Sequence, residues 1–197
     1  MTYNFFAMMS RMKYIERWAL MRNARQENLS EHSLEVSMIA HALCVIANTR
    51  FGRTLDADRA AVIGLFHDAT EIITGDMPTP IKYYNPDIRN AYKEVEGVAR
   101  QRLLQRLPED MRQVYEEIFT GTKEEDEVYM RRLVKAADKL SAFIKCIEEG
   151  HAGNGEFRTA KQSLSDILSD LGAELPEVRE FMKEFLPPYG NTLDELN

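Results

Sequence analysis

The chain has 197 residues, of which 44% are hydrophobic, and its 25 Lys and Arg against 32 Asp and Glu give a formal net charge of -7. A chain of this length can bury roughly 70% of the surface of its unfolded state, so a core can form without disulfides. The acidic balance argues against sequence-independent binding to nucleic acid, which needs clustered cations. It leaves open a small anionic ligand held by local arginines or by a metal.

The sequence shows no feature of a secreted or membrane-spanning protein. The two cysteines, Cys44 and Cys146, are too few for the disulfide framework of a secreted domain. The first residues, MTYNFFAMMSRMKY, lack the basic region and long apolar run of a secretory signal. No run of apolar residues approaches the length of a membrane span. We therefore expect a cytoplasmic protein with no membrane partner.

The apolar periodicity is helical almost throughout, and alternating strand patterns and hairpin signals are absent. The predicted helices cover, in chain order, about residues 3–15, 31–49, 56–74, 86–107, 108–120, 124–149, 156–171 and 176–186. A basic, irregular segment (17–30) follows the first helix, and the proline-rich segment DMPTPIKYYNP (76–86) follows the third. These elements predict an all-α bundle of about seven to nine helices in a single domain, residues 1–197.

The helix predicted over residues 31–49 has a clear start signal, because Asn28 or Ser30 can cap its first turn. Its apolar positions follow helical spacing: Leu34, Met38, Ala42 and Val45. The helix is therefore predicted to carry an apolar stripe along its length.

Potential metal ligands occur in strongly apolar helical surroundings. His32 lies near the start of the second predicted helix, His67 and Asp68 follow AAVIGLF directly, and Asp138 lies inside LVKAADKLSAF. An unpaired carboxylate buried in such surroundings costs several kcal/mol of folding free energy. One divalent metal bound by two imidazoles and two carboxylates would compensate all of these burials.

The order of these residues resembles that of the HD-domain superfamily of metal-dependent phosphohydrolases, with His67 35 positions after His32 and Asp138 70 positions after Asp68. Three blocks, RWALMRNARQENLSEHS, FHDATEIITGDMPTPIKYY and VKAADKLSAFIKCIEE, are similar to segments of the bacterial HD-domain 5'-deoxynucleotidases. The motifs fall within about residues 17–150, and residues 151–197 add only helical pattern.

This resemblance implies an all-α HD fold, a homodimer, and hydrolysis of deoxyribonucleoside 5'-monophosphates to deoxyribonucleoside and phosphate. It also implies one catalytic divalent cation. The implied metal ligands are His32, His67, Asp68 and Asp138, and His32 is also expected to border the substrate. Two nitrogen and two oxygen ligands admit Mn, Co, Fe, Zn or Mg, so the metal itself stays open.

Glu71 lies four residues after His67 and would share its face on a continuing helix. A carboxylate beside a metal, but not bound to it, can orient or deprotonate a water molecule. The alternative is a surface glutamate at the end of a helix. The resemblance favours the catalytic interpretation.

Arg17 offers phosphate a planar, two-pronged donor, and Trp18 offers a sugar or base a flat apolar wall. The alternative is a pair at a helix end, with Trp18 in the core. By the resemblance the pair faces the substrate, and Arg17 is expected to take part in catalysis as well as in binding. If Arg17 does not hold the phosphate, the next candidates are Arg22, Arg25 and Lys82.

Asp76 opens the loop after the third predicted helix and could simply cap a turn. By the resemblance it contacts the sugar of the nucleotide, and the residues after it, Met77, Pro78 and Thr79, also line the substrate site. Pro78 fixes its own φ, so the loop backbone is expected to be rigid.

Three other interpretations remain open on the sequence. One is an HD hydrolase that acts on nucleoside triphosphates, cyclic dinucleotides or guanosine polyphosphates. Another is a sensor that binds a metal or nucleotide without catalysis, for which Glu71 and Arg17 would not be needed. The third is a purely structural bundle, which leaves the charged groups in apolar helices unexplained.

Overall fold

The computed structural model describes residues 2–82 and 84–197, apart from the side chains of Thr79 and Pro80, and this part of the chain is helical without a β-strand. The helices of five or more residues in these ranges are α1 (Phe5–Met9), α2 (Leu29–Arg50), α3 (Ala57–Phe66), α6 (Pro86–Leu104), α7 (Glu109–Thr120), α8 (Glu125–His151), α9 (Arg158–Glu174) and α10 (Pro176–Glu184). Short elements are α4 (Glu71–Thr74), α5 (Thr79–Lys82) and the 3-10 helices η1 (Ser10–Tyr14), η2 (Gly155–Phe157) and η3 (Leu193–Leu196). The predicted all-α bundle is confirmed. Within the described ranges, each helix is too short or too polar to cross a membrane.

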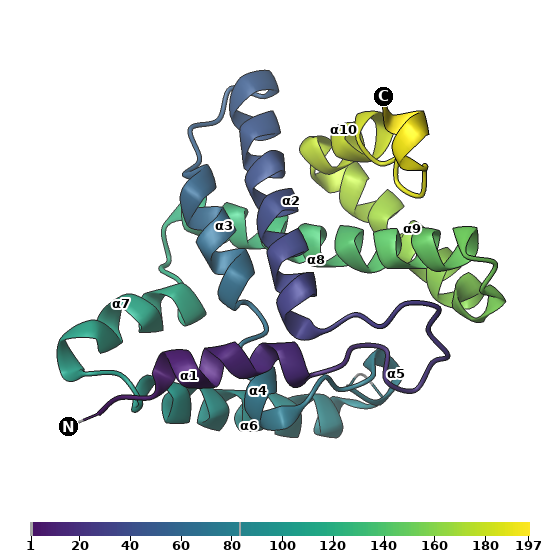
Figure 1. Ribbon diagram of the computed structural model, residues 1–197. Coiled ribbons are helices and arrows are strands. Elements are labelled where there is room, and N and C mark those ends of the chain that lie inside the picture. The colour runs from purple at the N-terminus through teal and green to yellow at the C-terminus, as the bar shows by residue number, and fades with distance from the viewer. Residues whose placement is uncertain (1, 83) are drawn as a thin grey trace.

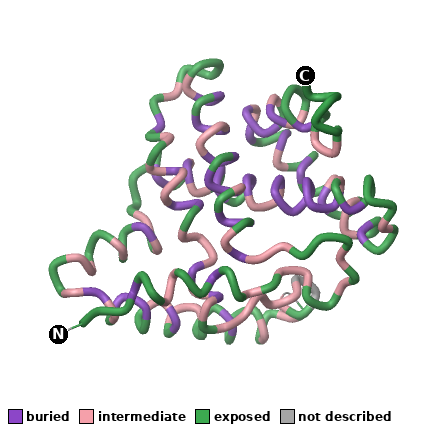
Figure 2. Tube along the Cα trace, in the orientation of Figure 1, coloured by how far each residue is buried: buried purple, intermediate pink, exposed green. Residues whose placement is uncertain are grey.

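The main core forms where α2, α3 and α8 pack together, with α9 and α10 against one side (Figure 1). Its buried residues include Val36, Leu43, Leu133, Leu140 and Leu168. Figure 2 shows buried stretches along α2 and α8 where the two helices pass each other. Because α2 begins at the same end of the bundle at which α3 stops, the first turn of α2 and the residues after α3 meet beside the middle of α8.

A second, smaller core joins α1, α6 and α7 to the end of α3. The ring of Phe66 packs edge-on against Tyr115, with ring centroids 5.7 Å apart, and Phe5 packs against the same tyrosine at 4.9 Å. Since Phe66 is the last residue of α3, this aromatic cluster fixes the position of His67, the residue that follows it.

The start of α2 follows the first of the two predicted caps. The Asn28 side chain accepts hydrogen bonds from the amides of Ser30 (3.0 Å) and Glu31 (3.2 Å), and Glu31 accepts one from the Asn28 amide (3.2 Å). This capping box starts the helix at Leu29, two residues earlier than expected. His32 therefore lies in the first turn of α2.

The predicted apolar stripe of α2 does not face the core. Leu34, Met38 and Val45 are 54%, 58% and 40% exposed, and Ala42 is half-buried. The buried apolar residues of α2 are Leu29, Val36, Ile39, Ala40, Leu43, Cys44, Ile46 and Ala47. The helix carries apolar residues on every side, so periodicity could not indicate which face is buried.

The predicted continuous helix over residues 56–74 is wrong. α3 ends at Phe66, a turn spans residues 67–70, and α4 begins at Glu71. In this turn the amides of Ala69 and Glu71 bond to carbonyls three residues back, at 3.1 and 2.9 Å, rather than four. The chain thus tightens into a 3-10-like path, and the α-helical spacing expected between His67 and Glu71 does not apply. The first predicted helix, 3–15, is likewise divided into α1 and η1.

Candidate active site

The four predicted metal ligands come together at the meeting point of α2, α3 and α8. One potential ligand atom from each of His32, His67, Asp68 and Asp138 lies within 4.8 Å of the others. His32 Nε2 is 3.2 Å from Asp138 Oδ1 and 3.7 Å from Asp68 Oδ2. His67 Nε2 is 2.9 Å from the same Asp68 oxygen. We call these four residues the metal cluster.

Hydrogen bonds on the far side of each imidazole orient the two histidines. His67 Nδ1 lies 2.7 Å from the Gly64 carbonyl oxygen, which can only accept, so this nitrogen carries the proton. His32 Nδ1 lies 3.0 Å from Ser141 Oγ. Because the Ser141 hydroxyl donates its hydrogen bond to Glu35 at 2.6 Å, it accepts one from His32, so Nδ1 of His32 also carries the proton. Both Nε2 atoms are buried and face the carboxylates of Asp68 and Asp138, without the alignment of a hydrogen bond to any described residue. This tautomer directs two Nε2 lone pairs into the metal cluster, so the donor set fits a divalent cation.

The charged groups of the metal cluster shift one another's pKa values. Burial, and then the charge of Arg17, lower the pKa of His32 to about 4. Burial would also lower the pKa of His67, but Asp68 and Asp138 raise it to about 9. Burial would raise the pKa of both aspartates, and the imidazoles lower it. A divalent cation would supply the positive charge that a protonated His67 otherwise provides.

Glu71 lies beside the metal cluster as the first residue of α4. Its side chain is buried, and its Oε2 has no hydrogen-bond partner among the described residues. Burial, followed by the charges of Asp68 and Asp76, raises the pKa of Glu71 to about 9. A cation bound at the metal cluster acts in the opposite direction and lowers this pKa. The carboxylate can therefore accept a proton next to the metal cluster.

Arg17 and Trp18 share one acceptor, which sequence reasoning missed. Glu27 Oε2 accepts a hydrogen bond from Arg17 Nη1 at 2.9 Å and from Trp18 Nε1 at 3.1 Å. The indole of Trp18 also packs edge-on against Phe157, with centroids 5.3 Å apart. Trp18 thus contacts the core on one side, as one interpretation expected, and the polar loop on the other.

The carboxylates of the metal cluster act on the charge of the Arg17 guanidinium. Its side chain is only 11% exposed. Burial alone would lower the pKa of Arg17, but the charge of Glu27 and then those of Asp138 and other carboxylates raise it. Arg17 is therefore a fixed, desolvated positive charge beside the predicted metal ligands, which is the setting in which a guanidinium binds phosphate well.

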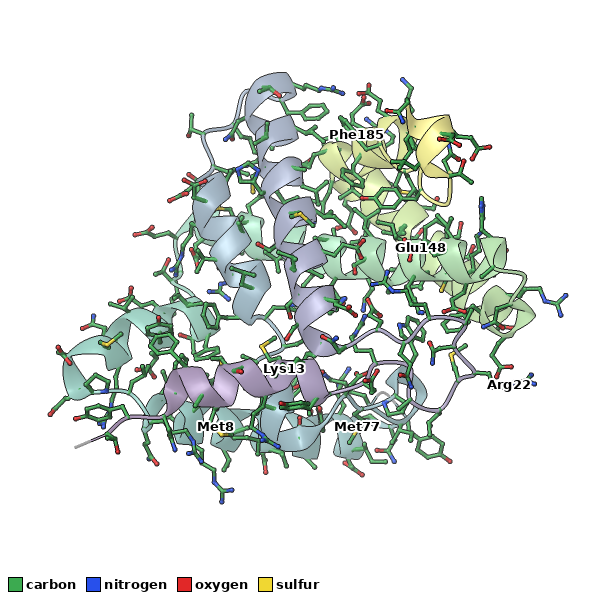
Figure 3. The ribbon with its side chains drawn as sticks, viewed as in Figure 1. Met8, Lys13, Arg22, Met77, Glu148 and Phe185 are labelled. Carbon is green, nitrogen blue, oxygen red and sulfur yellow. The ribbon has the colours of Figure 1, made fainter. Side chains whose placement is uncertain are left out.

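Asp76 follows α4 and lies close to the same pair. Burial raises its pKa, while the charge of Arg17 and the backbone amide of Trp18 act against that rise. Met77 lies beside α5 (Figure 3), and the Pro78 carbonyl accepts a hydrogen bond from the Ile81 amide at 2.9 Å. The side chain of Thr79, also predicted to line the substrate site, lies outside the described residues.

The three alternative candidates for phosphate binding, Arg22, Arg25 and Lys82, differ in exposure. Arg22 pairs with Glu156 at 2.7 Å and is exposed, at the outer edge of its loop (Figure 3), and Arg25 is also exposed. Lys82 is less exposed and pairs with Glu96 at 2.8 Å. The charge of Lys82 acts to lower the pKa of Glu71, the predicted catalytic carboxylate.

Comparison with known proteins places the chain in a family. The family described as 5'-deoxynucleotidase YfbR-like matches residues 4–189. A 5'-deoxynucleotidase of Shewanella oneidensis is 47% identical over 192 residues, which cover 98% of this chain and 96% of that protein. A 5'-deoxynucleotidase of Erwinia tasmaniensis is 45% identical over 194 residues, with the same coverage of 98% and 96%.

Two solved structures share the fold. An HD-domain phosphohydrolase from Listeria innocua has a TM-score of 0.80 at 21% identity, covering 96% of this chain and 90% of that one. The cyanophage S-2L HD phosphohydrolase, bound to dA and one catalytic Zn2+ ion, has a TM-score of 0.62 at 21% identity, covering 94% and 96%. The fold is therefore that of the HD phosphohydrolases, and the match over nearly the whole sequence shows that the chain belongs to the YfbR-like 5'-deoxynucleotidase family.

Proposed function

We propose that this protein is a 5'-deoxynucleotidase, which hydrolyses deoxyribonucleoside 5'-monophosphates to the deoxyribonucleoside and inorganic phosphate. The activity is that of the relatives at 45% and 47% identity. The observation that carries the proposal for this chain is a juxtaposition. Four potential metal ligands converge within 4.8 Å, bordered by the largely buried Arg17 and by the buried Glu71, whose Oε2 has no hydrogen-bond partner among the described residues.

His32, His67, Asp68 and Asp138 would hold one divalent cation. When bound, such a cation polarises a phosphate oxygen and lowers the pKa of a coordinated water. The cyanophage enzyme of the same fold carries a catalytic Zn2+. For this chain Co, Mn or another transition metal meets the same ligand requirement.

The remaining roles fall to the residues around the metal cluster. Glu71 would orient the attacking water and take up its proton. Arg17 would hold the phosphate and balance the charge that gathers on its oxygens during in-line attack. The carboxylates of the metal cluster shift the pKa of both groups, which supports these roles.

The sugar would lie between Trp18 and Asp76, and the Trp18 backbone acts on the pKa of the Asp76 carboxyl. His32 would border the substrate from the floor of the site, and the loop of Met77, Pro78 and Thr79 would cover it. The single flat indole and the loop carboxylate suit a deoxyribose, which has an apolar edge and one free hydroxyl.

The protein is further proposed to act as a cytoplasmic homodimer. The exposed apolar residues Leu34, Met38 and Val45 of α2 support an association of two copies, because a second chain could cover them. Light scattering of the purified protein gives the mass in solution. A monomer at micromolar concentration would contradict this part of the proposal.

The function is tested by a phosphatase screen with added Mn2+, Co2+ or Zn2+ over paired ribo- and deoxyribonucleoside 5'-monophosphates. The compounds dATP, cyclic di-GMP and ppGpp are assayed separately as alternative substrates. We expect phosphate release from the deoxyribonucleoside monophosphates. Turnover of the other compounds alone would identify a different HD hydrolase. Nucleotide binding without turnover would identify a sensor.

A further inference from the structure

Backbone hydrogen bonds join the two ends of the segment of residues 16–28. The Arg17 amide donates to the Glu27 carbonyl at 2.9 Å, and the Leu29 amide donates to the Ile15 carbonyl at 2.9 Å. Glu16 and Asn28 form the antiparallel bridge between these two bonds. The bridge brings Glu27 next to Arg17 and Trp18, although ten and nine residues separate them.

The carboxylate of Glu27 then contacts three residues of the proposed active site. Its Oε2 accepts from Arg17 and Trp18, and its Oε1 lies 3.9 Å from His32 Nδ1. Within the described part of the chain, Glu27 is the one hydrogen-bond acceptor of the Arg17 guanidinium, whose Nε is buried without a partner. It is likewise the acceptor of the single polar atom of the indole ring.

We propose that Glu27 is a positioning residue, which fixes Arg17 and Trp18 relative to each other and so couples phosphate binding to sugar selection. This inference rests on the roles proposed above for Arg17 and Trp18. Glu27 need not touch the substrate, since it acts through the two side chains that it holds.

Two features show why these side chains need a fixed partner. Trp18 has a φ of 56°, a left-handed backbone conformation that is unfavourable for a bulky residue and persists only where its surroundings enforce it. Arg17 borders a cavity of about 280 Å³, also lined by Glu16, Met21 and Asn23. Without Glu27, the guanidinium would border this space with no hydrogen-bond acceptor among the described residues. Glu27 is thus the polar partner that the two side chains share, while Phe157 supports the indole of Trp18 from its other side.

The first test is spectroscopic and needs neither metal nor substrate. Trp18 is the only tryptophan, so its fluorescence reports its own surroundings. Glu27→Gln keeps a neutral acceptor for the indole but loses the charge that binds Arg17, whereas Glu27→Ala loses both. We expect wild-type emission in Glu27→Gln. In Glu27→Ala we expect emission at longer wavelength and stronger quenching by acrylamide. Unchanged emission in Glu27→Ala would overturn the proposed hold on Trp18.

The second test is a double-mutant cycle on the metal-loaded enzyme. Loss of one charge-assisted hydrogen bond predicts a decrease of kcat/KM for dAMP of about 10- to 100-fold in Glu27→Gln. If Glu27 acts through Arg17, then Glu27→Gln in an Arg17→Ala background should change kcat/KM by less than about twofold. Additive losses in the double mutant would overturn the inference, even if phosphate binding by Arg17 is correct.

A matched control comes from the surface. Glu174 also pairs with an arginine, Arg132, at 2.7 Å, but both residues are exposed and lie on α8 and α9. Glu174→Gln should leave emission and kcat/KM at wild-type values. Arg17→Ala with wild-type kcat/KM would reject the proposed function of Arg17, and with it the coupling. The fluorescence of Glu27→Ala would still report separately on the contact with Trp18.

Discussion

His32 on α2 and Ser141 on α8 are joined by a hydrogen bond of 3.0 Å, and the Ser141 hydroxyl donates a hydrogen bond to Glu35 at 2.6 Å. The chain of donors fixes which ring nitrogen of His32 carries the proton, and it turns the other nitrogen toward the metal cluster. Partners of this kind typically change metal affinity 10- to 100-fold when they are removed.

Ser141→Ala should therefore weaken divalent-cation binding by about 10- to 100-fold with little change in fold, because the substitution removes one oxygen atom. Calorimetric titration of the chelator-treated protein with Mn2+ or Zn2+ measures the effect. Ser33→Ala is the matched control, since Ser33 is buried on α2 next to His32 but its hydroxyl has no partner in the described structure. Equal affinity in the two variants would contradict the orienting role of Ser141.

Removal of the metal should abolish activity reversibly and destabilise the fold. His67→Ala and Asp68→Ala should lose both binding and turnover. In the wild-type protein, free cation at 100 times its Kd should stabilise the native state by about 2.7 kcal/mol, which a thermal shift assay can detect. Full activity after dialysis against excess chelator would exclude a metal-dependent reaction.

Glu71→Ala should separate binding from chemistry. The variant is expected to bind cation and dAMP, while kcat falls by a factor of about 10² to 10⁴, as is usual when a general base is lost. Because Glu71 is buried and its Oε2 has no partner in the described part of the chain, its removal should not lower the thermal midpoint of the metal-free protein. Wild-type kcat in this variant would leave Glu71 without a catalytic role.

The metal cluster was predictable because its histidines and aspartates occur in apolar helical segments, where ionisable side chains are unfavourable. Charged groups such as Asp138 inside an apolar helix require an explanation, and the order of the histidines and aspartates provides one. Glu71 was also predicted to lie beside the metal cluster, and it does, although the continuous helix used to place it is broken at residues 67–70.

Glu27 could not be predicted in the same way. Its contact with Arg17 depends on an isolated bridge between Glu16 and Asn28, and a bridge in an irregular segment leaves no periodic pattern in the sequence. The exposed stripe of α2 was obscured for a different reason. When a helix is apolar on all sides, its sequence pattern does not indicate which face is buried.

The loop that carries Arg17 and Trp18 should be sensitive to acid through Glu149. Burial would raise the pKa of Glu149, but hydrogen bonds from Lys145, the Ala24 amide and Asn154 lower it to about 2 from an ordinary 4.5. A lowered pKa means that the ionised form stabilises the folded state. This contribution is complete above about pH 4.5 and is lost as the pH falls toward 2.

Glu149→Gln should consequently be less stable than the wild type at pH 7, and the difference in unfolding free energy should narrow at pH 3. Urea unfolding of both proteins in chelator at the two pH values gives this difference without the pH dependence of metal binding. A gap that stays constant between pH 7 and pH 3 would show that the charge of Glu149 does not contribute.

Selection of deoxyribose requires the site to reject a larger and more polar sugar. An apolar pocket that merely tolerates an added hydroxyl discriminates only about 10²-fold. Stronger selection needs a group that blocks the space or leaves the hydroxyl without a partner. Trp18 can do this because its indole is held on both sides, by Glu27 through Nε1 at 3.1 Å and by Phe157 at 5.3 Å between ring centroids.

Trp18→Ala should therefore reduce the ratio of kcat/KM for dAMP to kcat/KM for AMP, with some loss for both substrates, because the wall against the 2'-hydroxyl is gone. Asp76→Ala should lower turnover or binding of both sugars and change the ratio less, since Asp76 is proposed to accept a hydrogen bond from the 3'-hydroxyl that both sugars carry. Steady-state kinetics with the two nucleotides gives the ratio in each variant. If the ratio is the same in wild type, Trp18→Ala and Asp76→Ala, the sugar is selected by other residues, and a wild-type ratio near one would exclude a preference for deoxyribose.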